Sequence, residues 1–182
     1  MDERGKQLYT KGVTAPLSWS PAEKRPPVAF DDDITEDLGE DAPGRLARLT
    51  DRALNGRYYP TSIVTAWSPE LERGEKVGVG TRLIKRTTLA PWLPWPAFYG
   101  LIEVRWADLT EDRFHYGYIT TRLHPARGWW QVTIWREDGR LKARVQSLTI
   151  PRSLLSWIGL PIMRAIQRHA RSRALAAMRS TP

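Results

Sequence analysis

The sequence contains no cysteine, and this absence excludes two kinds of structure. Neither a disulfide framework nor a thiolate metal site can form, and a chain without cysteine fits a reducing compartment. No run of about 18 apolar residues occurs, so the sequence predicts no transmembrane helix. The charged N-terminus carries no apolar signal segment. We therefore expect a cytoplasmic protein.

Motifs for metals, cofactors and nucleophiles are also scarce. The three histidines are His115, His124 and His169, which form no His-x-x-His or Glu-x-x-His pair, so we expect no metal site. No Gly-x-Ser-x-Gly elbow or P-loop is present, and Gly78-Val79-Gly80 lacks the third glycine of a dinucleotide site. We expect no cofactor. The carboxylates of residues 31–41 match no known metal loop, and we expect a solvated loop there.

Charge of both signs is present but unevenly placed. The net charge is +8, yet residues 1–42 carry −5 and residues 43–182 carry +13. The segment from Arg152 onward holds six arginines and no acid. Such a basic face could meet nucleic acid or an anionic membrane. No nucleic-acid motif accompanies it, so the sequence favours a solvated helix face opposite the chain's own acidic N-terminal segment.

The pattern of apolar residues predicts an order of secondary structure. Residues 1–27 contain four prolines and predict an extended arm, which Leu17 and Trp19 pin to the body. A helix is predicted from Asp41, as its N-cap, to Asn55-Gly56. Alternating or β-branched segments predict strands at residues 27–30, 62–67, 77–88, 97–107, 113–121, 129–136 and 141–149.

The chain ends in a long predicted helix, from Pro161 to Ser180. Apolar residues recur there at steps of three and four, and they become smaller toward the C-terminus: Ile162, Met163, Ile166, Ala170, Ala174 and Ala177. The arginines at 164, 168 and 171 lie off this stripe and are expected in solvent. The element order predicts an α+β fold, a curved antiparallel sheet that grips a long C-terminal helix.

Three short motifs carry a family resemblance. They are Arg113-Phe114-His115-Tyr116-Gly117-Tyr118, then His124-Pro125 followed by Gly128, and then residues 160–168. In these motifs the chain resembles the DUF1990 (UPF0548) family, within the START or Bet v 1-like (SRPBCC, helix-grip) superfamily, over residues 43–180. The family often has acidic residues after that glycine, where this chain has Trp129-Trp130. We expect residues 28–182 to form a single helix-grip domain behind the arm of residues 1–27.

The resemblance implies a deep, largely apolar cavity between the sheet and the terminal helix. Members of the superfamily bind lipids, hormones or polyketides there, and some catalyse cyclisation or dehydration. Our leading hypothesis is therefore the binding of a small apolar or amphipathic molecule, lipid- or polyketide-like, in a pocket of several hundred Å³ over the alanine-rich half of the helix. An enzyme of cyclase or lyase type and a basic module for nucleic acid or anionic membrane are the alternatives. The sequence leaves enzymatic activity and the oligomeric state open.

The candidate ligand-binding residues are aromatic residues of the predicted sheet and apolar residues of the terminal helix. For each of them, the alternative is that it belongs to a packed core and contacts no ligand. They are Phe98, Trp106, Tyr116, Tyr118, Trp130, Ile166 and Ala170. The expected rims of the cavity are residues 91–96 and 123–128.

Tyr116 and His124 are the candidate catalytic residues. The alternative for His124 is a turn residue that bonds the backbone. Glu103 and His115 could form an acid–base pair on neighbouring strands, but the alternation favours an ordinary surface pair.

Overall fold

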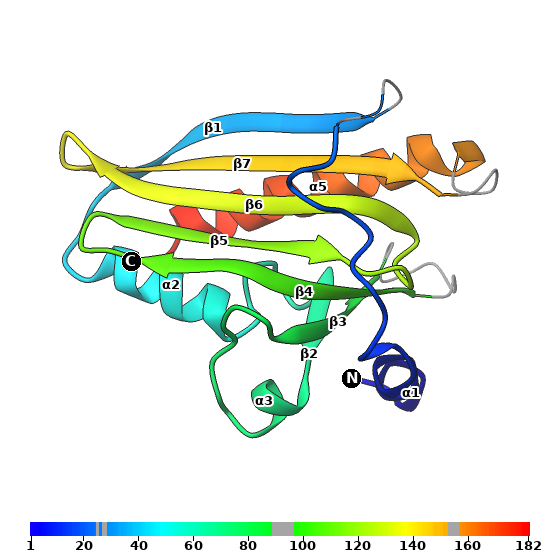
Figure 1. The fold of residues 1–182 in the computed structure, drawn as a ribbon. Coiled ribbons are helices and arrows are strands. Elements are labelled where there is room, and N and C mark those ends of the chain that lie inside the picture. Colours follow the sequence, from blue (N-terminus) through cyan, green and yellow to red (C-terminus); the bar gives the residue numbers. More distant parts are fainter. Residues whose placement is uncertain (25, 27–28, 89–96, 153–156) are drawn as a thin grey trace.

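A computed structural model describes residues 1–182 except 25, 27–28, 89–96 and 153–156. Its centre is an antiparallel sheet with the strand order β1-β7-β6-β5-β4-β3-β2 (Figure 1). The strands are β1 (Phe30–Glu40), β2 (Val64–Trp67), β3 (Arg82–Thr87), β4 (Phe98–Leu109), β5 (Arg113–Thr120), β6 (Ala126–Glu137) and β7 (Arg140–Pro151). The helices are α1 (Glu3–Gly12), α2 (Arg45–Leu54), α3 (Pro69–Glu72) and α5 (Leu160–Arg179).

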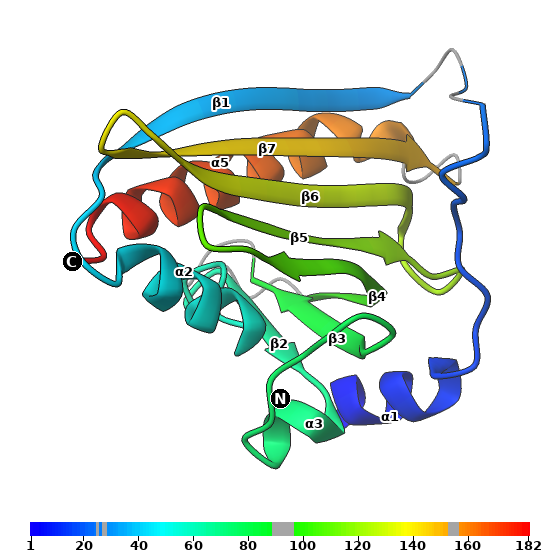
Figure 2. The same ribbon diagram turned by 60° about the vertical axis from the view of Figure 1, so that its left-hand side comes forward.

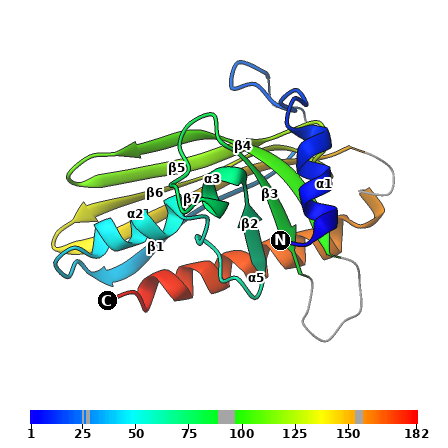
Figure 3. The ribbon, with the colours of Figure 1, turned by 90° about the horizontal axis from the view of Figure 1, so that it is seen from below.

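The predicted fold class is confirmed. The sheet lies against the long helix α5, and α2 lies beside the C-terminal half of that helix (Figure 3). The predicted helix between residues 41 and 56 is α2, although Gly44 and not Asp41 is its N-cap. The side chain of Asp41 instead accepts a hydrogen bond from Arg136 of β6. None of the described helices is long and apolar enough to cross a membrane.

The N-terminal segment differs from its prediction. Residues 3–12 form helix α1 and not an extended arm, because the carboxylate of Asp2 caps the helix by accepting from the Gly5 N–H at 2.9 Å. Tyr9 of α1 packs against Ile84 and Leu101 on the outer face of the sheet, beside β3 (Figure 2). The predicted anchors hold, since Leu17 bridges to Thr121 and Trp19 is buried.

The acidic segment of residues 31–41 was predicted as a solvated loop, and this prediction is wrong. It is the edge strand β1, which pairs with β7 along its whole length. Charged residues disfavour a strand on propensity alone. Here basic partners on the neighbouring strand offset that preference: Asp33 binds Arg144 at 2.6 Å, and Asp37 binds Arg140 and Lys142. Acidic residues of β1 therefore pair with basic residues of the C-terminal part, and the chain as a whole keeps its net charge of +8.

Helix α5 packs on a face rotated from the predicted stripe. Ile162 is 60% exposed, whereas Leu175 and Met178, which were not in the stripe, are buried. Ala174, Leu175 and Met178 join the main core with residues of α2 and the inner face of the sheet. Arg164 and Arg171, predicted in solvent, also face inward, because their guanidinium groups pair with Asp32 of β1.

Arg45, the first residue of α2, joins β1, α2 and α5. It is only 4% exposed, and its guanidinium donates to the backbone carbonyls of Leu38, Glu40, Met178, Arg179 and Thr181. The last carbonyls of a helix lack partners within the helix and carry partial negative charge. A buried cation at this position therefore caps α5 and fixes its C-terminal end against the sheet.

Replacing Arg45 by methionine is expected to lower the free energy of unfolding by about 3–5 kcal/mol, because buried carbonyls lose a charged donor. Arg48 of the same helix binds the Pro182 carbonyl at the exposed surface. Arg48→Met is thus the matched control, expected to change stability by less than about 0.5 kcal/mol. Urea unfolding followed by circular dichroism measures both, and equal losses in the two variants would contradict this role.

Candidate functional site

A cavity of about 180 Å³ lies between the N-terminal half of α5 and the sheet. Met163, Ile166, Gln167, Ala170 and Arg171 of α5 form one wall. The predicted volume of several hundred Å³ was too large, because aromatic side chains fill much of the space. An apolar cavity of about 150 Å³ holds benzene, so this one fits a compact, ring-sized ligand.

The position of the cavity also differs from the prediction, which placed it over the alanine-rich half of the helix. Ala174 is fully buried in the main core, since α2 fills the space beneath that half. The open space lies one to three turns earlier along α5. Of the predicted rims, residues 123–128 contribute His124 to Arg127 to the lining, and residues 91–96 lie outside the described residues.

Lys85 of β3 is the most unusual group in the cavity, and the sequence reasoning missed it. Its Nζ donates to the Tyr118 hydroxyl at 3.0 Å. It also lies 4.1 Å from the ring centroid of Tyr118, 4.8 Å from that of Tyr59 and 5.9 Å from that of Trp130. Burial lowers the pKa of Lys85 to about 7. Desolvation disfavours the ammonium, and cation–π contacts offset only part of that cost.

No carboxylate pairs with Lys85 in the part of the chain that the structure describes. The residues outside that part include no aspartate or glutamate in the sequence. Buried ammonium groups are normally paired. Lys85 therefore presents a lone amine to the cavity.

Tyr59 and Tyr118 surround this amine and keep their protons. Burial raises the pKa of both hydroxyls well above the usual value, and Tyr59 raises the pKa of Tyr118 further. The ring of Tyr118 stacks on that of Trp130 with centroids 5.4 Å apart. The cavity floor is thus an aromatic surface that carries neutral hydroxyl donors.

His124 lies at the same end of the cavity. Its Nδ1 is 2.9 Å from the carbonyl oxygen and 3.1 Å from the amide nitrogen of Ala126, so the alternative of a turn residue bonding the backbone is confirmed. The pKa of His124 is lowered to about 4, mainly by burial and also by the charge of Lys85. The hydrogen bond to Ala126 raises this pKa but does not offset the effect of burial. At neutral pH the ring is uncharged, so it can exchange hydrogen bonds but supplies no positive charge.

Gly100 of β4 makes room for this imidazole. A Cβ at position 100 would lie 2.2 Å from Cδ2 and 2.5 Å from Nε2 of His124, well inside contact distance. Any other residue at 100 would push the ring out of its place. The glycine is therefore a requirement of the cavity.

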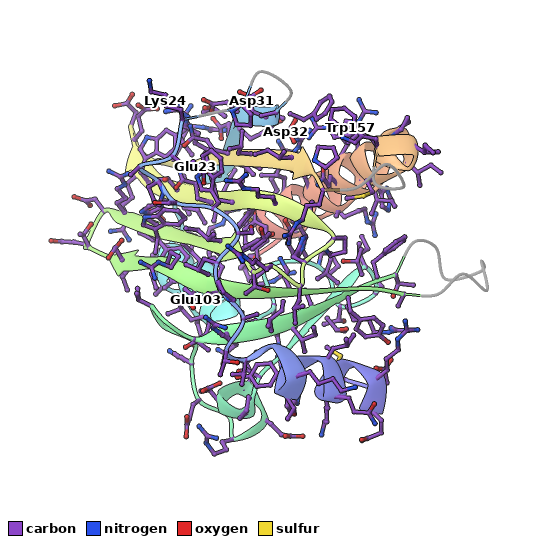
Figure 4. The ribbon with its side chains drawn as sticks, turned by 45° about the vertical axis from the view of Figure 1, so that its right-hand side comes forward. Glu23, Lys24, Asp31, Asp32, Glu103 and Trp157 are labelled. Carbon is purple, nitrogen blue, oxygen red and sulfur yellow. The ribbon has the colours of Figure 1, made fainter. Side chains whose placement is uncertain are left out.

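Asp32 of β1 and Arg171 of α5 line another side of the cavity, and Arg164 of α5 also pairs with Asp32 (Figure 4). Arg164 binds the carboxylate at 2.7 and 3.0 Å, and Arg171 binds it at 3.1 Å. Burial opposes the ionised form of Asp32, but the hydrogen bond and charge of Arg164 and the charge of Arg171 outweigh it and lower its pKa. The cluster ties the helix to the edge strand above the cavity.

Five of the seven predicted ligand-binding residues line this cavity: Phe98, Tyr118, Trp130, Ile166 and Ala170. The predicted catalytic residue His124 also lines it. Tyr116 faces inward but lies in the packed core, stacked on Phe114. Trp106 lies on the other face, with Trp19 and Ile119, because a bulge after Val104 shifts the register by one residue.

The predicted pair of Glu103 and His115 does not form. In the register of β4 and β5, Glu103 lies opposite Ile119, and His115 lies opposite Asp108. Glu103 is 8% exposed and binds Arg82 and Arg105, so it is a buried ion pair and not a surface residue (Figure 4). Among the described residues no cluster of His, Asp and Glu is placed to hold a metal ion.

Comparison with protein-family models gives one match. The model described as "Domain of unknown function (DUF1990)" covers residues 12–177. A search of curated proteins found no match to the chain.

Solved structures show a similar fold at low identity. A hypothetical protein of Helicobacter pylori has 11% identity and a TM-score of 0.52, over 88% of this chain and 91% of its own. Protein Ms6760 of Mycobacterium smegmatis has 17% identity and a TM-score of 0.48, over 82% and 88%. Major latex-like protein 151 of Panax ginseng has 13% identity and a TM-score of 0.45, over 79% and 98%.

The lowered pKa of Lys85 predicts a pH dependence of stability. The folded pKa of about 7 lies below the ordinary 10.5, so the unfolded state binds the proton first as the pH falls. The free energy of unfolding should rise by about 2 kcal/mol between pH 7.5 and 9.5. Denaturant titrations should show this rise in the native chain and in Lys142→Met, but not in Lys85→Met. A flat profile for the native chain would refute the burial of the amine.

Gly100→Ala should displace His124. We expect the His124 pKa, about 4 in the native chain, to rise toward 6.5 in the variant, read from the imidazole signals in an NMR titration. Gly78→Ala is the control, because nothing lies within 4 Å of the added Cβ and the backbone at residue 78 is not in the left-handed conformation that favours glycine. An unchanged His124 pKa in Gly100→Ala would show that the ring is not held there.

Proposed function

The chain belongs to the DUF1990 family, and from its helix-grip fold and cavity we propose that it binds a small, mainly apolar molecule between the sheet and α5. The observation that carries this proposal is a cavity lined by Trp130, Ile166 and Ala170 into which the unpaired amine of Lys85 projects. A small number of polar groups in a mainly apolar pocket fixes the orientation of a ligand. A buried amine that lacks a carboxylate partner is costly, and a ligand that binds it offsets part of that cost.

The volume narrows the ligand class. A long lipid chain or a fused polyketide would not lie wholly inside about 180 Å³, whereas a single substituted ring fits. The proposed ligand therefore has a ring-sized apolar body and one polar substituent. The substituent meets Lys85, Tyr118 and His124, and the body contacts Trp130 and Ile166.

The basic-module alternative receives no support from the contacts. Arg164 and Arg171 are 18% and 16% exposed and pair with Asp32, and Arg179 pairs with Glu36. These arginines are engaged within the molecule. The absence of cysteine keeps a cytoplasmic location as part of the proposal.

Benzyl alcohol, a ring with one polar substituent, is the probe for this function. It should raise the melting temperature of the native chain and bind measurably by calorimetry. Ala170→Leu, which fills the cavity from α5, should weaken binding by at least about tenfold, since contacts worth roughly 1.4 kcal/mol are lost.

Ala176→Leu is the matched control, because Ala176 is exposed on the same helix. It should bind benzyl alcohol as the native chain does. 1-Anilinonaphthalene, which is larger, should bind neither variant nor the native chain in this cavity. Equal binding by the native chain and Ala170→Leu, or no binding by the native chain, would overturn the proposal.

A further inference from the structure

We propose that Lys85 is a nucleophile that captures a small aldehyde as an imine in this cavity. This inference rests on the proposed function, because the aldehyde must first occupy the space between the sheet and α5. It adds a covalent step and a substrate class to that function.

The surroundings of Lys85 leave its amine accessible to a ligand. The side chains of Leu83, Lys85 and Thr87 lie on the inner face of the sheet, because every second residue of β3 points to the same side. Lys85 lies opposite Gly100 of β4 on one side and Ala66 of β2 on the other. Neither neighbour has a side chain long enough to cover Nζ. The amine therefore faces the cavity and contacts the rings of Tyr59, Tyr118 and Trp130.

The charge state favours nucleophilic attack. The titratable groups beside Lys85 are Tyr59, Tyr118 and His124, and none of them carries a negative charge at neutral pH. The carboxylate of Asp32 lines another side of the cavity, where it pairs with Arg164 and Arg171. At pH 7.5 a group with a pKa of about 7 is roughly three-quarters free amine, whereas an ordinary lysine is about one part in a thousand free amine. Desolvation in an apolar pocket is a known route to an activated lysine.

The step balances without an oxidant or reductant. The Nζ lone pair attacks the carbonyl carbon, the C–N bond forms, and the carbonyl π pair moves to oxygen. A proton passes from nitrogen to that oxygen, and the carbinolamine then loses water as the C=N bond forms. Tyr118, whose hydroxyl is 3.0 Å from Nζ and stays protonated, is placed to relay this proton.

The cavity limits the substrate class to compact carbonyl compounds. An aldehyde on a ring-sized body places its carbonyl at Nζ and its ring against Trp130 and Ile166. Benzaldehyde is the simplest such probe, and benzyl alcohol has nearly the same shape without the reactive carbonyl. Comparing the two separates binding from covalent capture.

The test is reductive trapping of the full chain. With benzaldehyde and cyanoborohydride at pH 7.5, peptide mapping should place the fastest benzyl labelling of any lysine on Lys85. Its labelling rate should exceed that of Lys76 and Lys142, which form ion pairs with Asp51 and Asp37, by at least about tenfold. This excess should shrink as the pH approaches 10, where ordinary lysines also become free amines.

Two variants complete the test. Lys85→Met should abolish the fast labelling, whereas Lys142→Met should label and bind benzyl alcohol as the native chain does. Binding of benzyl alcohol without selective labelling of Lys85 would overturn the imine and leave the proposed function standing. Neither binding nor labelling would overturn both.

Discussion

The hydrogen bonds of Arg45 decide how α5 lies on the sheet, and the cavity depends on that placement. A helix with alanines on its inner face could pack closely along its whole length. Here Arg45 and α2 hold only its C-terminal half against the sheet, where Ala174 and Met178 complete the core. The N-terminal half is held instead by Arg164 and Arg171 on Asp32, at the edge strand β1. Between these two attachments the helix spans an open space.

The attachments also explain why the charged residues are distributed as they are. Acidic residues gather on β1, and basic ones lie on β7 and α5, so opposite charges meet across the edge of the sheet. Exposed pairs of this kind stabilise a fold little, but the half-buried group of Asp32 with two arginines is shielded from solvent. The same edge is thereby protected from pairing with another chain. Lys85, on the far side of the cavity, has no carboxylate partner, and our proposal for its function starts from that contrast.

Much of the fold could be predicted from the sequence, since strands with two-residue alternation and a long helix leave clear patterns. The inward faces of Phe98, Tyr118 and Trp130 followed directly from that alternation. Trp106 did not, because a bulge after Val104 is invisible in the pattern. The face of α5 was misjudged because arginine stems pack like apolar residues while their charges pair inside. Lys85 was not considered in the sequence analysis, although it shares the inner face of β3 with Leu83 and Thr87.

The central claim is that Lys85 projects a desolvated, unpaired amine into a ligand-sized cavity. NMR titration of its side-chain Cε signal, assigned by comparison with Lys85→Met, tests this claim most directly. The account predicts a midpoint near pH 7 that moves when benzyl alcohol fills the cavity. A midpoint at the ordinary lysine value of about 10.4, with no response to the ligand, would contradict it.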